Sequence, residues 1–358
     1  MKKTQTNCAI ILLLQSFATV GFTQSLPPGL PTVDSARADA VVTFDTKTGV
    51  FSYSYRVANS TASAGSLDHF YIDISTTSNI ILTSSGLVNS ATGYAATQKI
   101  SELNARTLAG SIVPVGLASQ PAGWIVGLDA DMHAFWSSDL NASEIAPGQS
   151  INGFSMQSPA IPGIRRFDVG AYFEPGLFYP GIDEVATDTE ALKITNQENA
   201  AALACLFKGM TIGPVSPPSL KDVAELLGFL AGQKEQAAGL GWIRGDEYIK
   251  NLDEKLEQAQ KALADKHDLE ARKKLEQFIQ KIEDQRRAQT HRHHGGGDDH
   301  GQGDDRDGWR RDEGDKTFLS GNAYYLLKPN AEYILSKLPK KPGEGDDRGS
   351  GDDGAHRR

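Results

Sequence analysis

The sequence predicts two folded domains, an antiparallel β-sandwich of immunoglobulin-like type over residues 26–212 and a small helical bundle over residues 219–339. Three observations lead to this prediction. Short stretches of alternating apolar and polar residues fill the first range, as in half-buried strands. A proline-rich stretch at residues 213–218 then indicates a linker. Beyond it, apolar residues recur at three- and four-residue spacing, as on one face of a helix.

The chain begins with features typical of a secretory signal peptide over residues 1–25. Lys2 and Lys3 precede an apolar run at residues 9–14 that continues toward residue 20, and small residues near residue 25 offer a cleavage position. The run is interrupted at residues 15–16 and is shorter than the ~20 residues of a membrane-spanning helix. We therefore expect a secreted, extracellular protein with no transmembrane segment.

Removal of the signal peptide would leave Cys205 as the one cysteine of the mature chain. A single thiol forms no internal disulfide, so the fold must depend on its apolar core. Cys205 lies in the apolar stretch 200–207 with no histidine nearby in the sequence. We expect a small buried side chain rather than a nucleophile.

Charge differs between the two domains. Residues 26–218 hold 9 Lys and Arg against 17 Asp and Glu, whereas residues 219–290 hold 13 against 14. The acidic first domain argues against a nucleic acid or an anionic membrane as partner. The interleaved charges of the second are typical of solvated helix faces.

The clearest strand of the first domain lies at residues 49–57. There Phe51, Tyr53, Tyr55 and Val57 alternate with polar residues. Further strands are predicted at residues 40–44, 70–74, 80–83, 111–115, 124–128, 151–156 and 166–173, with a helical turn at residues 100–108. Eight or nine short strands with few helical stretches between them favour the sandwich.

Four amphipathic segments are expected in the second domain. They begin near residue 219, after Asp246, near Asp268 and at Tyr324, and the last must accommodate Pro329. We expect Asp246, the last residue of an Arg-Gly-Asp tripeptide, to cap its helix rather than to mark an adhesion motif. Each segment is apolar on one face only, so the helices must pack together.

The helical segments resemble the FIMAH domain, a small helical module at the C-terminal end of secreted bacterial proteins that include polysaccharide-degrading enzymes. The resemblance covers roughly residues 219–338, and the residues that carry it are 240–243, Leu252, Leu256, 259–263, 275–282, Ala323 and Leu327. It implies an accessory or attachment role rather than catalysis, and it carries over no catalytic residue.

The sequence departs from the FIMAH pattern at residues 291–315. This stretch of His, Asp, Gly and Arg holds four histidines and eight acidic residues. Long surface insertions cost little, since loop closure grows only logarithmically with length. We expect a disordered insertion here and a disordered tail of similar composition at residues 340–358.

Metal binding is the alternative for this insertion, through His291, His293, His294 and His300. An EF-hand aligned on Gly308 would place glycine at both the first and the twelfth ligand positions, so it is not formed. Imidazoles on a glycine-rich chain favour weak, adventitious binding of Zn²⁺, Ni²⁺ or Cu²⁺ over a dedicated site. No resident cofactor is expected.

The first domain offers one further candidate site. Asp129, Asp131 and His133 would share one face of an extended strand and could gather a cation, although a turn explains them as well. Trp124 and Trp136 could form a platform for a ligand if exposed, but tryptophan is more often a core residue.

The sequence contains no Gly-x-Ser-x-Gly, His-Glu-x-x-His or Gly-x-x-x-x-Gly-Lys motif. We therefore predict a secreted, non-catalytic binding protein whose partner is an extracellular glycan or another cell-surface component. Two alternatives remain open, a metal-binding or metal-scavenging protein and a hydrolase with an unrecognised site on the sandwich.

Overall fold

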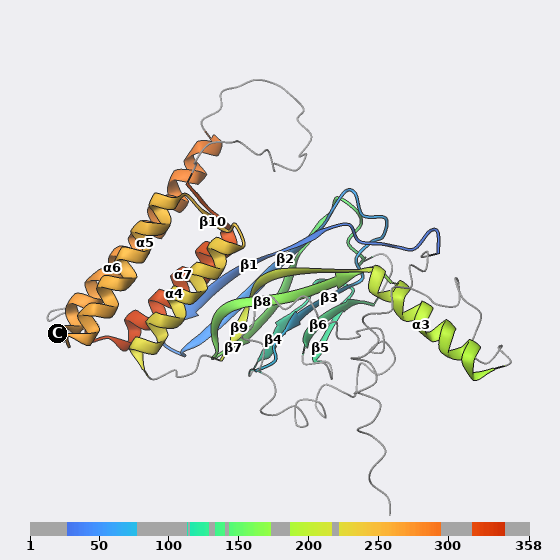
Figure 1. Ribbon diagram of the computed structural model, residues 1–358, viewed down its shortest axis with the longest axis horizontal. Coiled ribbons are helices and arrows are strands. Elements are labelled where there is room, and N and C mark those ends of the chain that lie inside the picture. The colour runs from blue at the N-terminus through green and yellow to red at the C-terminus, as the bar shows by residue number, and fades with distance from the viewer. Residues whose placement is uncertain are drawn as a thin grey trace, which may run out of the picture.

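The computed structural model describes residues 27–76, 113, 115–128, 133–139, 143–172, 187–216, 222–294 and 317–340. Antiparallel sheets occupy the middle of the molecule, and a group of helices covers one end of them (Figure 1). A mixed fold of β-sheets and helices is therefore confirmed. The predicted signal peptide, the strand at residues 80–83, the turn at 100–108 and nearly all of the tail lie outside the described residues.

Two sheets form the β part, which we call the two-sheet unit. The first has the order β1-β2-β7-β4, with β1 at Ala36–Asp45, β2 at Val50–Asn59, β7 at Ser150–Ser158 and β4 at Gly116–Ser119. The second has the order β5-β6-β3-β8-β9, with β5 at Trp124–Leu128, β6 at His133–Ser138, β3 at His69–Asp73, β8 at Ile161–Gly170 and β9 at Leu206–Val215.

The inner faces of the two sheets pack against each other through aromatic rings. The alternation predicted for β2 is present, because its apolar residues are buried and Ser54 and Arg56 are exposed. Tyr55 of β2 meets Phe70 of β3 with ring centres 5.7 Å apart, in an edge-to-face arrangement. This contact joins strands of different sheets into one core.

Four helices form the second part, which we call the helical unit. They are α4 (Val223–Gly239), α5 (Asp246–Ala264), α6 (Asp268–His294) and α7 (Gly321–Lys337). A short ladder of β10 (Ile243–Arg244) and β11 (Phe318–Leu319) ties the start of α5 to the start of α7. These helices agree with the four predicted segments. Asp246 is the first residue of α5 and not its cap, a position that Gly245 takes.

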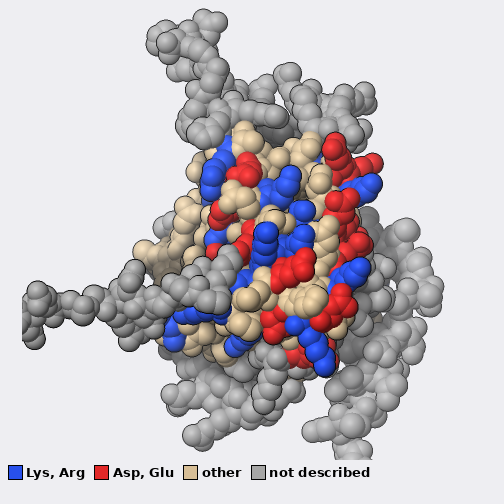
Figure 2. All heavy atoms as spheres, turned by 90° about the vertical axis from the view of Figure 1, so that its left-hand side faces the viewer, with Lys and Arg blue, Asp and Glu red and all other residues tan. Residues whose placement is uncertain are grey.

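The interior of the helical unit is apolar apart from one charge. Leu256, Phe278 and Ala323 are buried. The side chain of Lys234 on α4 is fully buried, and its ammonium pairs with Glu235 at 2.6 Å and with Asp253 of α5. The outer face, by contrast, carries intermixed charges of both signs (Figure 2). The predicted solvated helix faces are thus present.

The helical unit packs on the two-sheet unit through α7, which lies along strand β1. β1 pairs with β2 on one side only, so backbone groups on its other side need partners. Asn322 of α7 supplies them. Its Oδ1 accepts a hydrogen bond from the Ala40 N–H at 2.9 Å, and its Nδ2 donates to the Ala38 carbonyl at 3.4 Å.

Two further amides of the helical unit do the same for strand β8. The ladder between β8 and β3 ends at Phe167, so the residues of β8 before Phe167 have no neighbouring strand on that side. Gln233 of α4 accepts from the Ile164 N–H at 2.8 Å, and Asn330 of α7 donates to the Pro162 carbonyl at 2.7 Å. Strand edges and helices therefore share one continuous set of buried contacts.

Several elements differ from the sequence expectation. Strands β4 and β6 were not predicted, and the described residues Val113 and Val115 of the predicted strand at 111–115 are not in a strand. Helix α3 (Asp188–Ala204) was not predicted and lies at the opposite end of the sheets from α5 and α6 (Figure 1). The first half of the predicted linker is part of strand β9, which runs to Val215. Proline is tolerated there because β9 is an edge strand, and the carbonyl of Pro214 accepts a hydrogen bond from Arg165 Nε at 2.9 Å.

We predict that Asn322→Ala destabilises the whole chain. The substitution leaves the buried N–H of Ala40 without a partner, which costs about 1–3 kcal/mol. Urea unfolding followed by circular dichroism measures the loss. The control is Asn251→Ala on α5, whose exposed amide contacts only its own helix, and which should change stability by less than about 0.5 kcal/mol. Equal effects of the two substitutions would contradict the interface described here.

Candidate ligand-binding cleft

A cleft with a volume of about 800 Å³ lies where the helical unit meets the two-sheet unit. It is lined by strand β1, by part of β9, by the turn after α4 and by the first turn of α7. The lining side chains that carry hydrogen-bonding groups or rings are those of Arg37, Asp39, Ser54, Tyr55, Arg56, Asn152, Phe167, Phe207, Trp242, Arg286, Phe318, Ser320, Asn322 and Tyr325. A junction between two packed units is a common place for a ligand site.

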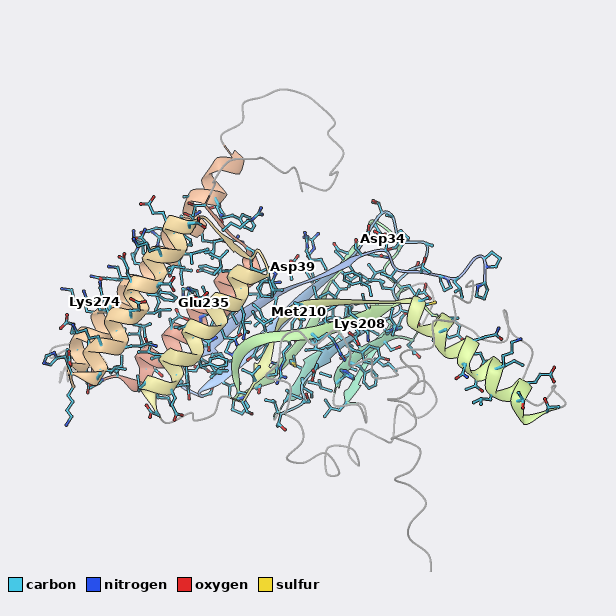
Figure 3. All side chains as sticks on the ribbon, in the orientation of Figure 1. Asp34, Asp39, Lys208, Met210, Glu235 and Lys274 are labelled. Carbon is cyan, nitrogen blue, oxygen red and sulfur yellow. The ribbon has the colours of Figure 1, made fainter. Side chains whose placement is uncertain are left out.

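The cleft forms at the corner where the edge strands of the two sheets lie side by side. β1 ends the four-stranded sheet and β9 ends the five-stranded sheet, and the two are in contact. Asp39 of β1 and Met210 of β9 lie close together at this corner (Figure 3). Alternation along β1 buries Ala38 and Ala40 in the core and turns Arg37 and Asp39 outward into the cleft.

Trp242 is held in the cleft wall by its own backbone. Helix α4 ends at Gly239, and Gly241 adopts a positive φ of 70°, which glycine allows at little cost. The Trp242 N–H donates to the Ala237 carbonyl at 2.9 Å, and its carbonyl accepts from the Ser320 N–H at 2.8 Å. The indole is half-buried, so part of it remains accessible.

The cleft contains more positive than negative side chains. Arg37 Nε lies 2.9 Å from Asp39 Oδ2, so these two charges are paired. Arg56 donates to the hydroxyl of Ser150 at 2.9 and 3.1 Å. Arg286 lies with its guanidinium 6.0 Å from the centre of the Tyr324 ring. Within the described ranges, no carboxylate pairs with Arg56 or Arg286.

The two predicted platform residues lie elsewhere. Trp124 is 3% exposed and Trp136 is 0% exposed, and both pack in the core between the sheets. Their indole N–H groups donate to the carbonyls of Ser143 and Ser119, at 2.8 and 3.1 Å. A buried ring presents no face to a ligand, so both are core residues, the more frequent role of tryptophan.

Only His133 of the predicted cation site of Asp129, Asp131 and His133 lies within the described residues. β5 ends at Leu128, and the antiparallel strand β6 begins at His133. His133 is buried on β6, with its ring centre 5.8 Å from that of Tyr71. Asp129 and Asp131 lie outside the described residues.

The four predicted metal ligands fall at the end of α6 and beyond it. The helix backbone continues through His291, His293 and His294, whereas His300 lies outside the described residues. The first four residues of the predicted insertion are therefore helical. Among the residues that the structure describes, no group of three or more His, Cys, Asp and Glu side chains could hold a metal ion.

The outer face of the five-stranded sheet carries a second group of charges. Asp168 of β8 lies directly opposite Lys208 of β9 in the ladder, and Arg166 Nε is 3.3 Å from Asp168 Oδ1. Burial lowers the pKa of Lys208, while the charge of Asp168 raises it. Opposite charges at facing positions stabilise a strand pair, although Lys208 Nζ and Asp168 Oδ1 are both buried with no hydrogen-bond partner in the described part of the chain.

Comparisons with protein-family models, with curated proteins and with solved structures each returned no match. The resemblance to the FIMAH domain therefore stays a prediction. Over the described part of the chain, no helix is both long enough and apolar enough to cross a bilayer.

Cys205 is buried, as expected from its apolar surroundings, but histidine is closer in space than the sequence suggested. His69 Nδ1 lies 2.6 Å from Asp68 Oδ1, and both residues are buried at the same end of the five-stranded sheet as Cys205. Burial, and then the negative charge of Asp68, raises the pKa of the thiol from an ordinary 9.0 to about 11. A thiol that is protonated at neutral pH is a poor nucleophile, so this group gives no support to the hydrolase alternative.

We predict that Cys205 is nearly unreactive in the folded protein. With a pKa of about 11, roughly one thiol in a thousand is ionised at pH 8. In a Cys8→Ser background, an aromatic disulfide reagent should react at least about 100-fold more slowly in buffer than in denaturant. Reaction at similar rates in both solutions would contradict the burial of Cys205.

Proposed function

We propose that this chain is an extracellular, non-catalytic binding protein that attaches to a glycan or another cell-surface component through the cleft between its two units. The observation that carries the proposal is the cleft itself. Half-buried rings of Trp242, Phe318 and Tyr325 share it with the hydrogen-bonding side chains of Arg37 and Asp39. Apolar surface with a few polar groups that fix orientation is typical of binding sites.

This combination suits a sugar chain. A sugar ring presents C–H groups that pack on an aromatic face and hydroxyl groups at its rim that need hydrogen-bond partners. Arginine and asparagine side chains donate to such hydroxyls, and Asp39 accepts from them. Glycoside hydrolysis requires a pair of carboxylates beside the scissile bond, whereas Asp39 is the sole carboxylate among the described lining residues and is already paired with Arg37. Binding is therefore favoured over hydrolysis.

The proposal includes an architecture. Two antiparallel sheets packed through their inner faces support an immunoglobulin-like sandwich, and four helices in the order α4 to α7 support an attachment module related to the FIMAH domain. The signal peptide expected from the sequence supports export to the extracellular side.

We predict that Trp242→Ala weakens binding to insoluble polysaccharide. Loss of one stacking ring removes about 1–2 kcal/mol, which corresponds to roughly 5- to 30-fold in affinity. Co-sedimentation of the whole chain with polysaccharides chosen from a glycan array measures this change. The whole chain is required because the two units share buried hydrogen bonds.

The matched control is Tyr172→Ala. Tyr172 is 49% exposed and is not among the residues that line the cleft. Its substitution should leave binding unchanged. The proposal fails if the intact chain binds no polysaccharide or other cell-surface component, or if Tyr172→Ala weakens binding as much as Trp242→Ala.

Metal binding by the histidine-rich segment is a second candidate function. The observation that favours it is the extent of α6, since three of the four histidines fall in regular helix and not in glycine-rich chain. Positions 291 and 294 are three residues apart and share one face of the helix, so they could supply two ligands of a zinc site, whereas position 293 lies on another face. Such a segment would scavenge or sense divalent metal outside the cell.

We predict that zinc binding, measured by calorimetry, is lost when His291, His293 and His294 are replaced by alanine. Bound histidines must be neutral, so the affinity should also fall below about pH 6. His267→Ala, in the turn between α5 and α6, is the control because this exposed histidine lies outside the segment. An unchanged zinc signal in the triple variant would exclude this function for the helical histidines.

A further inference from the structure

Two of the three arginines that line the cleft, Arg56 and Arg286, have no ion pair among the described residues, whereas the third, Arg37, is paired with Asp39. Lys234 is paired with two carboxylates, and Arg287 pairs with Glu283 and Asp284 on the surface. Arg56 and Arg286 line the cleft and have no such pairing within the described ranges. Arg56 donates to the neutral hydroxyl of Ser150 and lies opposite Asp39 in the β1–β2 ladder, but Asp39 itself pairs with Arg37.

The first turn of α7 adds positive potential at the same place. Ser320 caps this helix, with its Oγ accepting from the Ala323 N–H at 3.0 Å, and no acidic residue occupies the first turn. Ser320 and Gly321 both line the cleft. The N-terminal end of a helix carries a partial positive charge, which here lines the same cleft as Arg56 and Arg286.

Arg286 lies close to this helix end. A Cβ built on Gly321 would be 3.9 Å from a terminal nitrogen of the Arg286 guanidinium, so the arginine of α6 and the first turn of α7 are neighbours. The guanidinium and the partial positive charge of the helix end thus lie near each other, and no described residue places a carboxylate between them. A negative group bound in this space would be stabilised by both.

We infer that the ligand of the cleft is an acidic polysaccharide, whose carboxylate or sulfate groups pair with Arg56 and Arg286 while its sugar rings pack on Trp242. This inference rests on the proposed glycan-binding function and adds the charge of the ligand. Guanidinium groups bind carboxylate and sulfate oxygens through two parallel hydrogen bonds, which lysine does not offer. The rings of Trp242, Phe318 and Tyr325 favour a sugar polymer over a small inorganic anion, because only the polymer has sugar rings that can pack on them.

The net charge of the chain, −9, does not prevent this association. At physiological ionic strength, charges more than about 8 Å apart are largely screened. The charged groups inside the cleft therefore determine most of the electrostatic contribution to ligand binding. A nucleic acid is also a polyanion, so it tests whether the cleft selects an acidic sugar polymer or any polyanion. Duplex DNA therefore serves as a counter-probe.

The experiment compares two matched pairs of probes with the full chain by calorimetry. One pair is an oligomer of polygalacturonate and the same oligomer with its carboxylates methyl-esterified. The other is dextran sulfate and dextran of the same length. Preference for either acidic member by at least about tenfold, together with weaker binding at high salt, supports the inference and identifies carboxylate or sulfate as the recognised group.

The variants test whether the cleft is responsible. Arg56→Gln combined with Arg286→Gln should weaken binding of the preferred acidic probe at least about tenfold, because both side chains are removed from charge-assisted contacts. Arg287→Gln is the control on the same helix, since this neighbour of Arg286 points to exposed partners and does not line the cleft. It should leave the affinity within about twofold.

The outcomes separate this inference from the proposed function. Equal binding of acidic and neutral probes, sensitive to Trp242→Ala but not to the arginine variants, would overturn the acidic ligand and leave glycan binding intact. Binding of none of the four polymers, with no sugar found on a glycan array, would overturn both. Tighter binding of duplex DNA than of either acidic polymer would overturn the inference in favour of nucleic acid.

Discussion

The whole arrangement depends on how the free edges of two strands are satisfied. β1 and the first half of β8 each have backbone groups that lie outside the strand ladders, and an exposed edge of this kind is open to pairing with other chains. Thr211 of β9 donates to one of them, the Ala38 carbonyl, at 2.8 Å. Three side-chain amides from the helical unit, those of Gln233, Asn322 and Asn330, bind these groups instead. A side-chain amide can replace a strand because it offers one donor and one acceptor at about the spacing of a peptide group. The helices are therefore part of the fold of the sheets.

The cleft follows from that attachment. α7 lies along β1 with Asn322 bonded to its edge, which brings the first turn of the helix and the turn after α4 over the corner where β1 and β9 meet. Trp242 is fixed by backbone bonds to both α4 and Ser320, so the wall of the cleft moves only if the helical unit moves. A ligand that touches Arg37 on one side and Trp242 on the other would bridge the two units. Binding should accordingly add to the stability of the interface.

Local pattern was sufficient to predict the strands and helices whose periodicity is strong. The alternation at residues 49–57 is β2, and the four apolar stripes are α4 to α7, including the helix that contains Pro329. β9 was not predicted because Gly209, Gly213 and Pro214 are residue types common in loops. α3 was not predicted because its apolar residues show little helical period. The cleft could not be predicted, since it joins β1 to residues some 200 positions later. Outward alternation of Arg37 and Asp39 on β1 was the one local signal available for it.

Arg165 differs from Arg56 and Arg286 of the cleft both in how deeply it is buried and in the groups that it contacts. Arg165 is 1% exposed and donates from Nε to the Pro214 carbonyl, while burial lowers the pKa of its guanidinium and the neighbouring Asp73, Tyr53 and Tyr55 raise it. That arginine holds two strands together in the core. Arg56 and Arg286 stand on elements from different units, remain accessible and face a space that already contains a helix N-terminus. Their convergence on an open cleft is better explained by a negative group that arrives with the ligand.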